Sequence, residues 1–133
     1  MLRLEIQKLS SRGGVSKHQE YKMLYETKFL VSLILTLLIE VPIVLILVRF
    51  FSPKIKTYKA ILTSILATAL TLPYLWFIFP VYIEYPFYII IGEMIVFFTE
   101  SLIYWQMLPI SLKKALLISF IANLISLSVG LLL

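Results

Sequence analysis

The 133 residues include 61% apolar and only 14% charged side chains, with 12 basic and 7 acidic residues. Soluble domains usually carry roughly a quarter charged residues, so this composition excludes an ordinary soluble domain and predicts a membrane protein. The net charge of +5 does not indicate nucleic-acid binding, because the basic residues lie in the N-terminal segment and beside the apolar runs, where they fit anionic lipid headgroups.

The inventory of reactive side chains is narrow. There is no cysteine and no aspartate, and the single histidine, His18, lies in the polar N-terminal segment. A disulfide framework, a thiolate metal site and a histidine metal site within the membrane are therefore excluded. We expect no metal site and no cofactor.

Residues 1–28 form a polar, basic N-terminal tail. "MLRLEIQKLS" places Leu2, Ile6 and Leu9 on one helical face, which predicts a short helix lying on the membrane surface; a disordered tail is the alternative. "SSRGGVS" then indicates a flexible break. The tail lacks the apolar stretch and small-residue cleavage site of a signal peptide.

Four apolar windows follow, and each is long enough for a bilayer core, which takes ~20 helical residues. They cover residues 29–51, 57–79, 85–107 and 111–133. A transmembrane β-barrel would instead show segments of alternating apolar and polar residues. The sequence predicts an all-α membrane protein with four transmembrane helices and no separate soluble domain.

The charged loops predict an orientation. Six basic residues flank the first and third connections, whereas "FPVYIEYPFY" between the second and third windows has none and contains Glu84. The positive-inside rule places both basic loops in the cytoplasm of a multi-pass cell-membrane protein. Three lysines before the first window favour the opposite orientation, and a native start at Met23 instead of Met1 would remove most of this conflicting charge.

Polar residues within the windows follow helical spacing. The first window has Ser32, Thr36 and Glu40, and the third has Glu93 and Glu100 two turns apart. The second and fourth windows carry similar stripes, namely Ser64, Thr68 and Thr71, and Ser119, Asn123 and Ser126. Because lipid offers these groups no partner, we expect the stripes to converge inside a four-helix bundle.

The chain also contains an internal repeat. A shift of 55 residues lays "KAILTSILATALTLP", from Lys59, over "KALLISFIANLISLS", from Lys114, with six of fifteen positions identical. Matching the preceding windows pairs "IEVPIV" with "TESLIY". The sequence thus predicts two tandem helical hairpins, residues 29–79 and 85–133, related by an approximate two-fold axis along the membrane normal.

The repeat pairs Glu40 with Glu100 and Thr68 with Asn123. All four lie nine residues from the loop end of their helix, roughly 13 Å into the bilayer from the same side at ~1.5 Å per residue. Each hairpin is therefore expected to place one acid opposite one hydrogen-bonding partner.

The glutamates are the strongest functional signal. An acid in the middle of a span costs ~2.5 to 3.5 kcal/mol, and no lysine or arginine lies at the same depth in any window to neutralise it. The offset must come from a proton, a cation, a cationic substrate or a basic group on another subunit. The predicted proton- or cation-binding residues are Glu40, Glu93, Glu100, Thr68, Asn123 and Ser126. The alternative is structural, with protonated acids bonded to Thr68 and Asn123 and the hydroxyls serving helix packing.

Three functions are compatible with these residues. The first is a small cation- or proton-linked transporter, or its membrane subunit, in which two nearby carboxyls share one proton or cation. The second is a non-enzymatic accessory or assembly subunit of a larger membrane complex. An intramembrane enzyme is disfavoured, because GxSxG, HExxH and phosphate-binding glycine motifs do not occur. The small bundle also predicts self-association or other membrane subunits as partners.

Four spans in a short chain, with a glutamate midway along the first span in "IEVP", resemble the small multidrug resistance transporters. The resemblance would imply export of cationic drugs. It is confined to these features: the long tail, the tandem repeat and two further acids in the third window depart from that pattern. We assign no family from it.

Overall fold

The structure is a computed structural model that describes residues 16–84 and 87–132. The chain divides into two compact units, Met1–Ser32 and Leu33–Leu133. The expected surface helix with Leu2, Ile6 and Leu9 lies outside the described residues. The polar residues of interest lie in the second unit.

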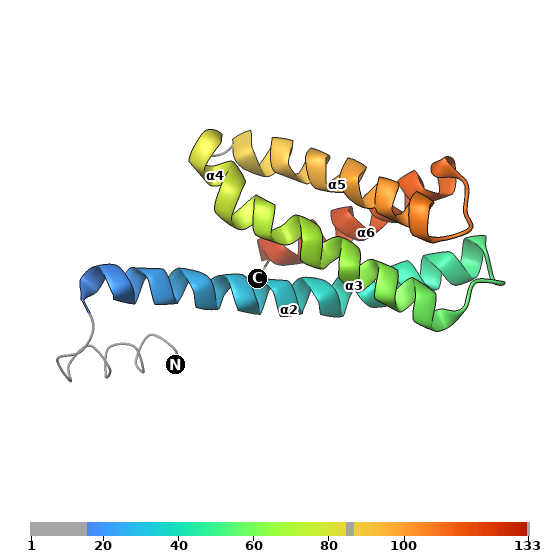
Figure 1. Cartoon of the computed structure of the whole chain (residues 1–133), viewed down its shortest axis with the longest axis horizontal. Helices are drawn as coiled ribbons and strands as arrows, with labels where there is room; N and C mark the ends of the chain where they lie inside the picture. The colour runs from blue at the N-terminus through green and yellow to red at the C-terminus, as the bar shows by residue number, and fades with distance from the viewer. Residues whose placement is uncertain (1–15, 85–86, 133) are drawn as a thin grey trace. The chain divides into compact units, whose positions relative to one another are not determined.

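Every regular element in the described part of the chain is helical (Figure 1). The elements are α2 (Lys17–Phe51), α3 (Thr57–Pro73), the π-helix η1 (Tyr74–Ile78), α4 (Phe79–Tyr82), α5 (Phe87–Met107) and α6 (Leu112–Leu132). Four helical stretches are long and apolar enough to cross a membrane: Lys17–Phe51, Thr57–Tyr82, Phe87–Met107 and Leu112–Leu132. The prediction of an all-α chain with four candidate spans is confirmed.

Helix α2 begins earlier than the predicted start of the first span at residue 29. Its start at Lys17 is set by a capping box: the Gln19 N–H donates to Ser16 Oγ, and the Ser16 N–H donates to Gln19 Oε1. Hydropathy alone locates only the apolar part of this helix. Because residues 17–28 are polar, hydropathy leaves these turns outside the predicted span and in the tail.

The second candidate span is interrupted by two prolines. Pro73 ends α3 and Pro80 lies in α4, and neither can donate a backbone hydrogen bond. Between them the chain forms η1, where the Phe79 N–H donates to the Tyr74 carbonyl five residues earlier. The chain thus accommodates the two prolines with a π-helical turn, a common way to absorb such a defect.

Helix α5 is the closest-packed helix of the second unit. It runs against α3 on one side and α6 on the other, and it also contacts η1 and α4 (Figure 1). A Cβ at Gly92 would collide with Leu75 of η1 and lie 3.0 Å from Phe79, so glycine permits this approach. Gly130, by contrast, has open space around it within the chain.

The backbone of α2 stays farther from the other helices. Its buried face carries Glu40, Val44 and Val48. The buried face of α5 includes the small residues Gly92 and Ser101. Small residues let helix backbones approach within a membrane, which explains why α5 packs closely and α2 packs through its side chains.

The second unit has its polar residues inside and its apolar residues outside. Glu40, Ser64, Thr68, Glu100 and Ser119 are each at most 2% exposed. Most of the large aliphatic and aromatic side chains on the four helices point outward; Leu38, for example, is 67% exposed. This arrangement suits a bundle surrounded by lipid, because hydrocarbon solvates aliphatic side chains and offers polar groups no partner.

Burial follows the internal repeat. Each buried residue of α6 has a buried counterpart 55 positions earlier in α3, and each buried residue of α2 has a buried counterpart 60 positions later. The pairs are Ala60–Ala115, Thr63–Ile118, Ser64–Ser119, Ala67–Ala122 and Thr68–Asn123, then Glu40–Glu100, Val44–Tyr104 and Val48–Leu108. The two hairpins thus present corresponding faces to the interior.

Candidate functional site

Glu40 of α2 is held inside the unit by hydroxyl groups. Its side chain is 2% exposed, and its Oε2 atom accepts a 2.6 Å hydrogen bond from Thr68 Oγ1 of α3. The Ser126 hydroxyl of α6 lies near the same carboxyl and interacts with it. Glu40 therefore receives one partner from its own hairpin and one from the other.

Glu100 of α5 is held by a hydroxyl and an amide. Asn123 Nδ2 of α6 donates to Oε2 at 2.7 Å, and Thr71 Oγ1 of α3 lies 2.9 Å from Oε1. The Asn123 amide also donates to the Ser119 carbonyl at 2.9 Å, which fixes its orientation. Glu100 is 1% exposed, so these groups replace water around its carboxyl.

The hydrogen bonds of the two acids follow the repeat. Thr68 and Asn123, which serve the acid of their own hairpin, are 55 residues apart, and so are Thr71 and Ser126, which serve the acid of the other hairpin. Thr68 and Thr71 lie one turn apart on α3, about 4.5 Å along its axis. Helix α3 thereby brings both carboxyls to the same level of the bundle.

Thr71 allows Glu100 to change its protonation state without rearrangement. The Thr71 hydroxyl has one hydrogen and two well-placed partners, Glu100 Oε1 and the Ala67 carbonyl oxygen, each at 2.9 Å. It can donate to an ionised Glu100. If Oε1 carries a proton, the carboxylic acid donates to Thr71 Oγ1 and the hydroxyl turns to Ala67. Within the described residues the Thr68 hydroxyl bonds only to Glu40, which gives Glu40 no such alternative.

No basic side chain reaches either acid within the described residues. The nearest basic groups along the bundle are at its loop end, where Lys114 Nζ donates to the Phe51 carbonyl at the end of α2. Nor does the described part of the chain contain a cluster of three or more histidine, cysteine or acidic residues able to hold a metal ion. The site is an acid pair with neutral partners.

Glu93 lies apart from this pair. It precedes Glu100 by two helical turns, about 10 Å along α5, and it is partly buried. The Glu93 carboxyl makes no hydrogen bond to any described residue, although its charge acts on Glu100 through space. Of the six predicted site residues, five form one cluster, and Glu93 lies apart from it, toward the end of the bundle opposite the basic loops.

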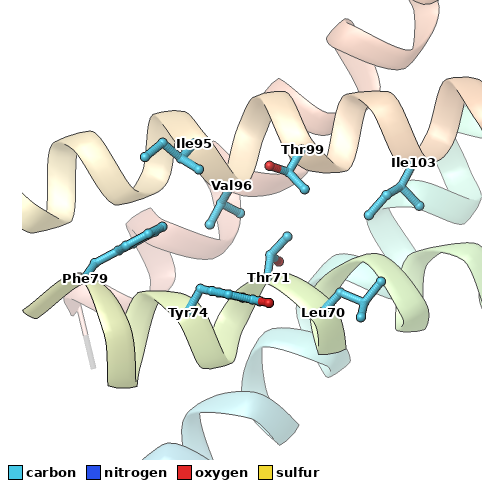
Figure 2. A pocket seen from close by; sticks show the side chains of 8 residues that line it. All are labelled: Leu70, Thr71, Tyr74, Phe79, Ile95, Val96, Thr99 and Ile103. Carbon is cyan, nitrogen blue, oxygen red and sulfur yellow. The ribbon is translucent and has the colours of Figure 1, made fainter.

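A pocket of about 440 Å³ lies beside the cluster, between α5 and the α3–η1–α4 segment (Figure 2). Figure 2 shows Thr71, Tyr74 and Thr99 as its only hydroxyl-bearing walls. The complete lining is Leu70, Thr71, Tyr74, Phe79, Ile95, Val96, Thr99 and Ile103. Thr71 connects the two features, because it lines the pocket and bonds to Glu100.

The sequence placed Glu40 opposite Thr68 and Glu100 opposite Asn123, and the structure contains both contacts. It did not single out Thr71 as a partner of Glu100, although the 55-residue shift that relates Thr68 to Asn123 also relates Thr71 to Ser126. The sequence did not indicate that Tyr104 lies near the acids. Tyr104 corresponds to Val44 in the repeat, so the repeat carried no signal for its hydroxyl.

Comparison with protein-family models, curated proteins and solved structures gave no match to this chain. The likeness to small multidrug resistance transporters therefore remains a similarity of layout. Functional inference depends on the geometry of the site.

Proposed function

We propose that the chain is a small proton- or cation-linked membrane transporter, or the membrane subunit of one, with the Glu40–Glu100 pair as its binding site. The observation that carries the proposal is two almost fully buried acids on different helices with only neutral partners. Each acid at this depth costs ~2.5 to 3.5 kcal/mol. A bound proton or small cation offsets that cost, and two neighbouring carboxyls can share it.

The proposal includes the symmetry of the repeat. The hairpins α2–α3 and α5–α6 form two tandem units related by an approximate two-fold axis along the membrane normal, with the acids near the axis. The support is the matched burial of the two halves and the reciprocal hydrogen bonds, in which each acid takes one partner from each hairpin.

The proton is held on Glu100 in this scheme. Thr71 accepts from the carboxylic acid and donates to Ala67, or donates to the carboxylate, so proton binding and release need only a hydroxyl rotation. Glu40 remains bonded to Thr68 and Ser126, and Glu93 acts as a second station toward the opposite face. A bound alkali cation would instead use the acid and hydroxyl oxygens of the same cluster.

Placement in the cell membrane completes the proposal. The basic connections after α2 and α5 face the cytoplasm, and the loop with Glu84 faces outward. The exposed apolar surface contacts lipid, a second copy or other membrane subunits.

The test is proton and cation flux in vesicles that contain the purified chain and a pH-sensitive dye. The wild type should dissipate an imposed proton or Na⁺ gradient, and Glu40→Gln or Glu100→Gln should reduce the rate at least about a hundredfold, the scale of losing a positioned proton-transfer group. Glu84→Gln is the matched control, because Glu84 is exposed outside the apolar windows. Wild-type flux equal to empty vesicles, or unchanged flux in both core variants, contradicts the proposal.

An accessory subunit is the second candidate function. It is favoured by the hydrogen bonds already made to both acids within the chain, since a purely structural acid needs no further ligand. In that case Gln at both positions preserves folding and assembly, because the amide still bonds to the same neighbours, and the vesicles show no flux with any variant.

A further inference from the structure

Two buried hydroxyls next to the acid pair have no hydrogen-bond partner among the described residues. They are Ser64 Oγ and Tyr104 OH. Both side chains are 0% exposed. A buried polar atom without a partner costs free energy, so native structures satisfy almost all of them with protein groups or ordered water.

The two hydroxyls lie at one level of the bundle. Ser64 is one turn before Thr68 on α3, and Tyr104 is one turn after Glu100 on α5. Because the two helices run in opposite directions, both steps lead from the acids toward the loop end. The two hydroxyls are close enough to interact, and the charges of Glu100 and Glu40 act on Tyr104, but the Ser64 and Tyr104 oxygen atoms do not have the geometry of a hydrogen bond.

We propose that Ser64 and Tyr104 bind a buried water molecule that carries protons between the acid pair and the loop end of the bundle. The inference rests on the proposed function. Two hydroxyls and a neighbouring carboxyl supply the two to four polar partners that a buried water requires. The proton leaves the Glu100 carboxylic acid for the water oxygen, and, once the path to the loop end is open, the water passes one of its own protons to solvent there. The hydroxyls orient the water and are unchanged by the transfer.

An aliphatic layer closes the path beyond this water. Val48, Ile55 and Leu108 are 1%, 5% and 3% exposed and belong to one apolar cluster at the loop end. In the opposite direction, Thr36 and Glu93 are polar and only partly buried. This structure is therefore the state in which the acids are shut off from the basic loops, and proton release on that side requires the layer to open.

The first test uses two variants that remove one oxygen each, Tyr104→Phe and Ser64→Ala, in vesicles oriented by the N-terminus. Proton release on the basic-loop side should slow at least about tenfold in each. Because both hydroxyls hold one water, the double variant should be no slower than the slower single variant. The controls are Tyr82→Phe and Ser128→Ala, whose side chains are exposed. Wild-type rates in both variants, or losses that multiply in the double variant, overturn the inference.

A second readout separates a relay from a structural role. Infrared difference spectra after a pH jump report the protonated carboxyls directly, and their amplitude at equilibrium should change less than about twofold in Tyr104→Phe while their rate falls. A wild type without any carboxyl signal refutes the proposed function, whereas a normal signal with an unaltered rate in Tyr104→Phe refutes only the relay.

A high-resolution experimental map of the wild type must show water between the two hydroxyls. A direct contact without water there overturns the inference whatever the variants do.

Discussion

The two hairpins hold equivalent acids in unequal surroundings. In the α5–α6 hairpin the helices pack closely, and Glu100 is fixed by the Asn123 amide, which is itself bonded to Ser119. In the α2–α3 hairpin the α2 backbone stays farther from its neighbours, and Glu40 is held by hydroxyls alone. The two acids therefore match in depth and burial but differ in how firmly their hydrogen bonds hold them.

This inequality suits a site that shares one ligand. A hydroxyl can turn to follow a carboxyl that moves, whereas the Asn123 amide, bonded on both hydrogens, keeps Glu100 in place. We therefore expect α2 with Glu40 to be the part that shifts when the bundle changes its packing, and the α5–α6 hairpin to be the fixed reference. The predictions below test that division.

The largest expected effect comes from the paired core positions 44 and 104. Because lipid is as apolar as a core side chain, the cost of truncation in a membrane is mainly the cavity. At about 24 cal/mol per Å³, Tyr104→Ala, which removes roughly 100 Å³, should lower the free energy of unfolding by about 2.5 kcal/mol, and Val44→Ala by about 1 kcal/mol. Thermal unfolding in detergent micelles measures both. Equal losses would mean that α2 is packed as firmly as α5.

Gly92 tests the close packing of α5 from the other direction. Gly92→Val places a side chain where Leu75 and Phe79 already lie, and overpacking of this kind costs about 1 to 3 kcal/mol. Gly130→Val is the matched control, because its neighbourhood is open, and it should change stability by less than about 0.5 kcal/mol. Thermal unfolding of the two variants side by side checks this, and a harmless Gly92→Val would show that α5 does not depend on glycine for its approach.

Much of the fold followed from the sequence because a bilayer imposes strong constraints. The length of apolar runs located the four candidate spans, and the 3.6-residue period of the polar positions identified the faces that became buried. The start of α2 at Lys17 was missed, since a capping box extends a helix into polar sequence that hydropathy does not register.

The site followed in part for a similar reason. The repeat placed Thr68 and Asn123 opposite their acids, because residues at one depth on inward faces must meet. It could not supply the partner that each acid takes from the other hairpin, which depends on the distances between helices. Nor could it anticipate Tyr104, whose counterpart is Val44.

The smallest and most specific effect concerns the partners of the acids. Asn123→Thr gives Glu100 the hydroxyl that Glu40 already has, and Thr68→Asn gives Glu40 an amide. Hydrogen bonds between membrane helices average only ~0.6 kcal/mol, so each exchange should alter stability by about 1 kcal/mol or less. The carbonyl stretch in the infrared spectrum is sensitive to the hydrogen bonds of a protonated acid. At a pH low enough to protonate both acids, it should therefore resolve two environments in the wild type, approach one in Asn123→Thr, and show two again, with their assignments exchanged, when both substitutions are combined. Identical spectra in all three proteins would mean that the acids are equivalent, and the asymmetry of the two hairpins would then have no consequence for the proposed shared ligand.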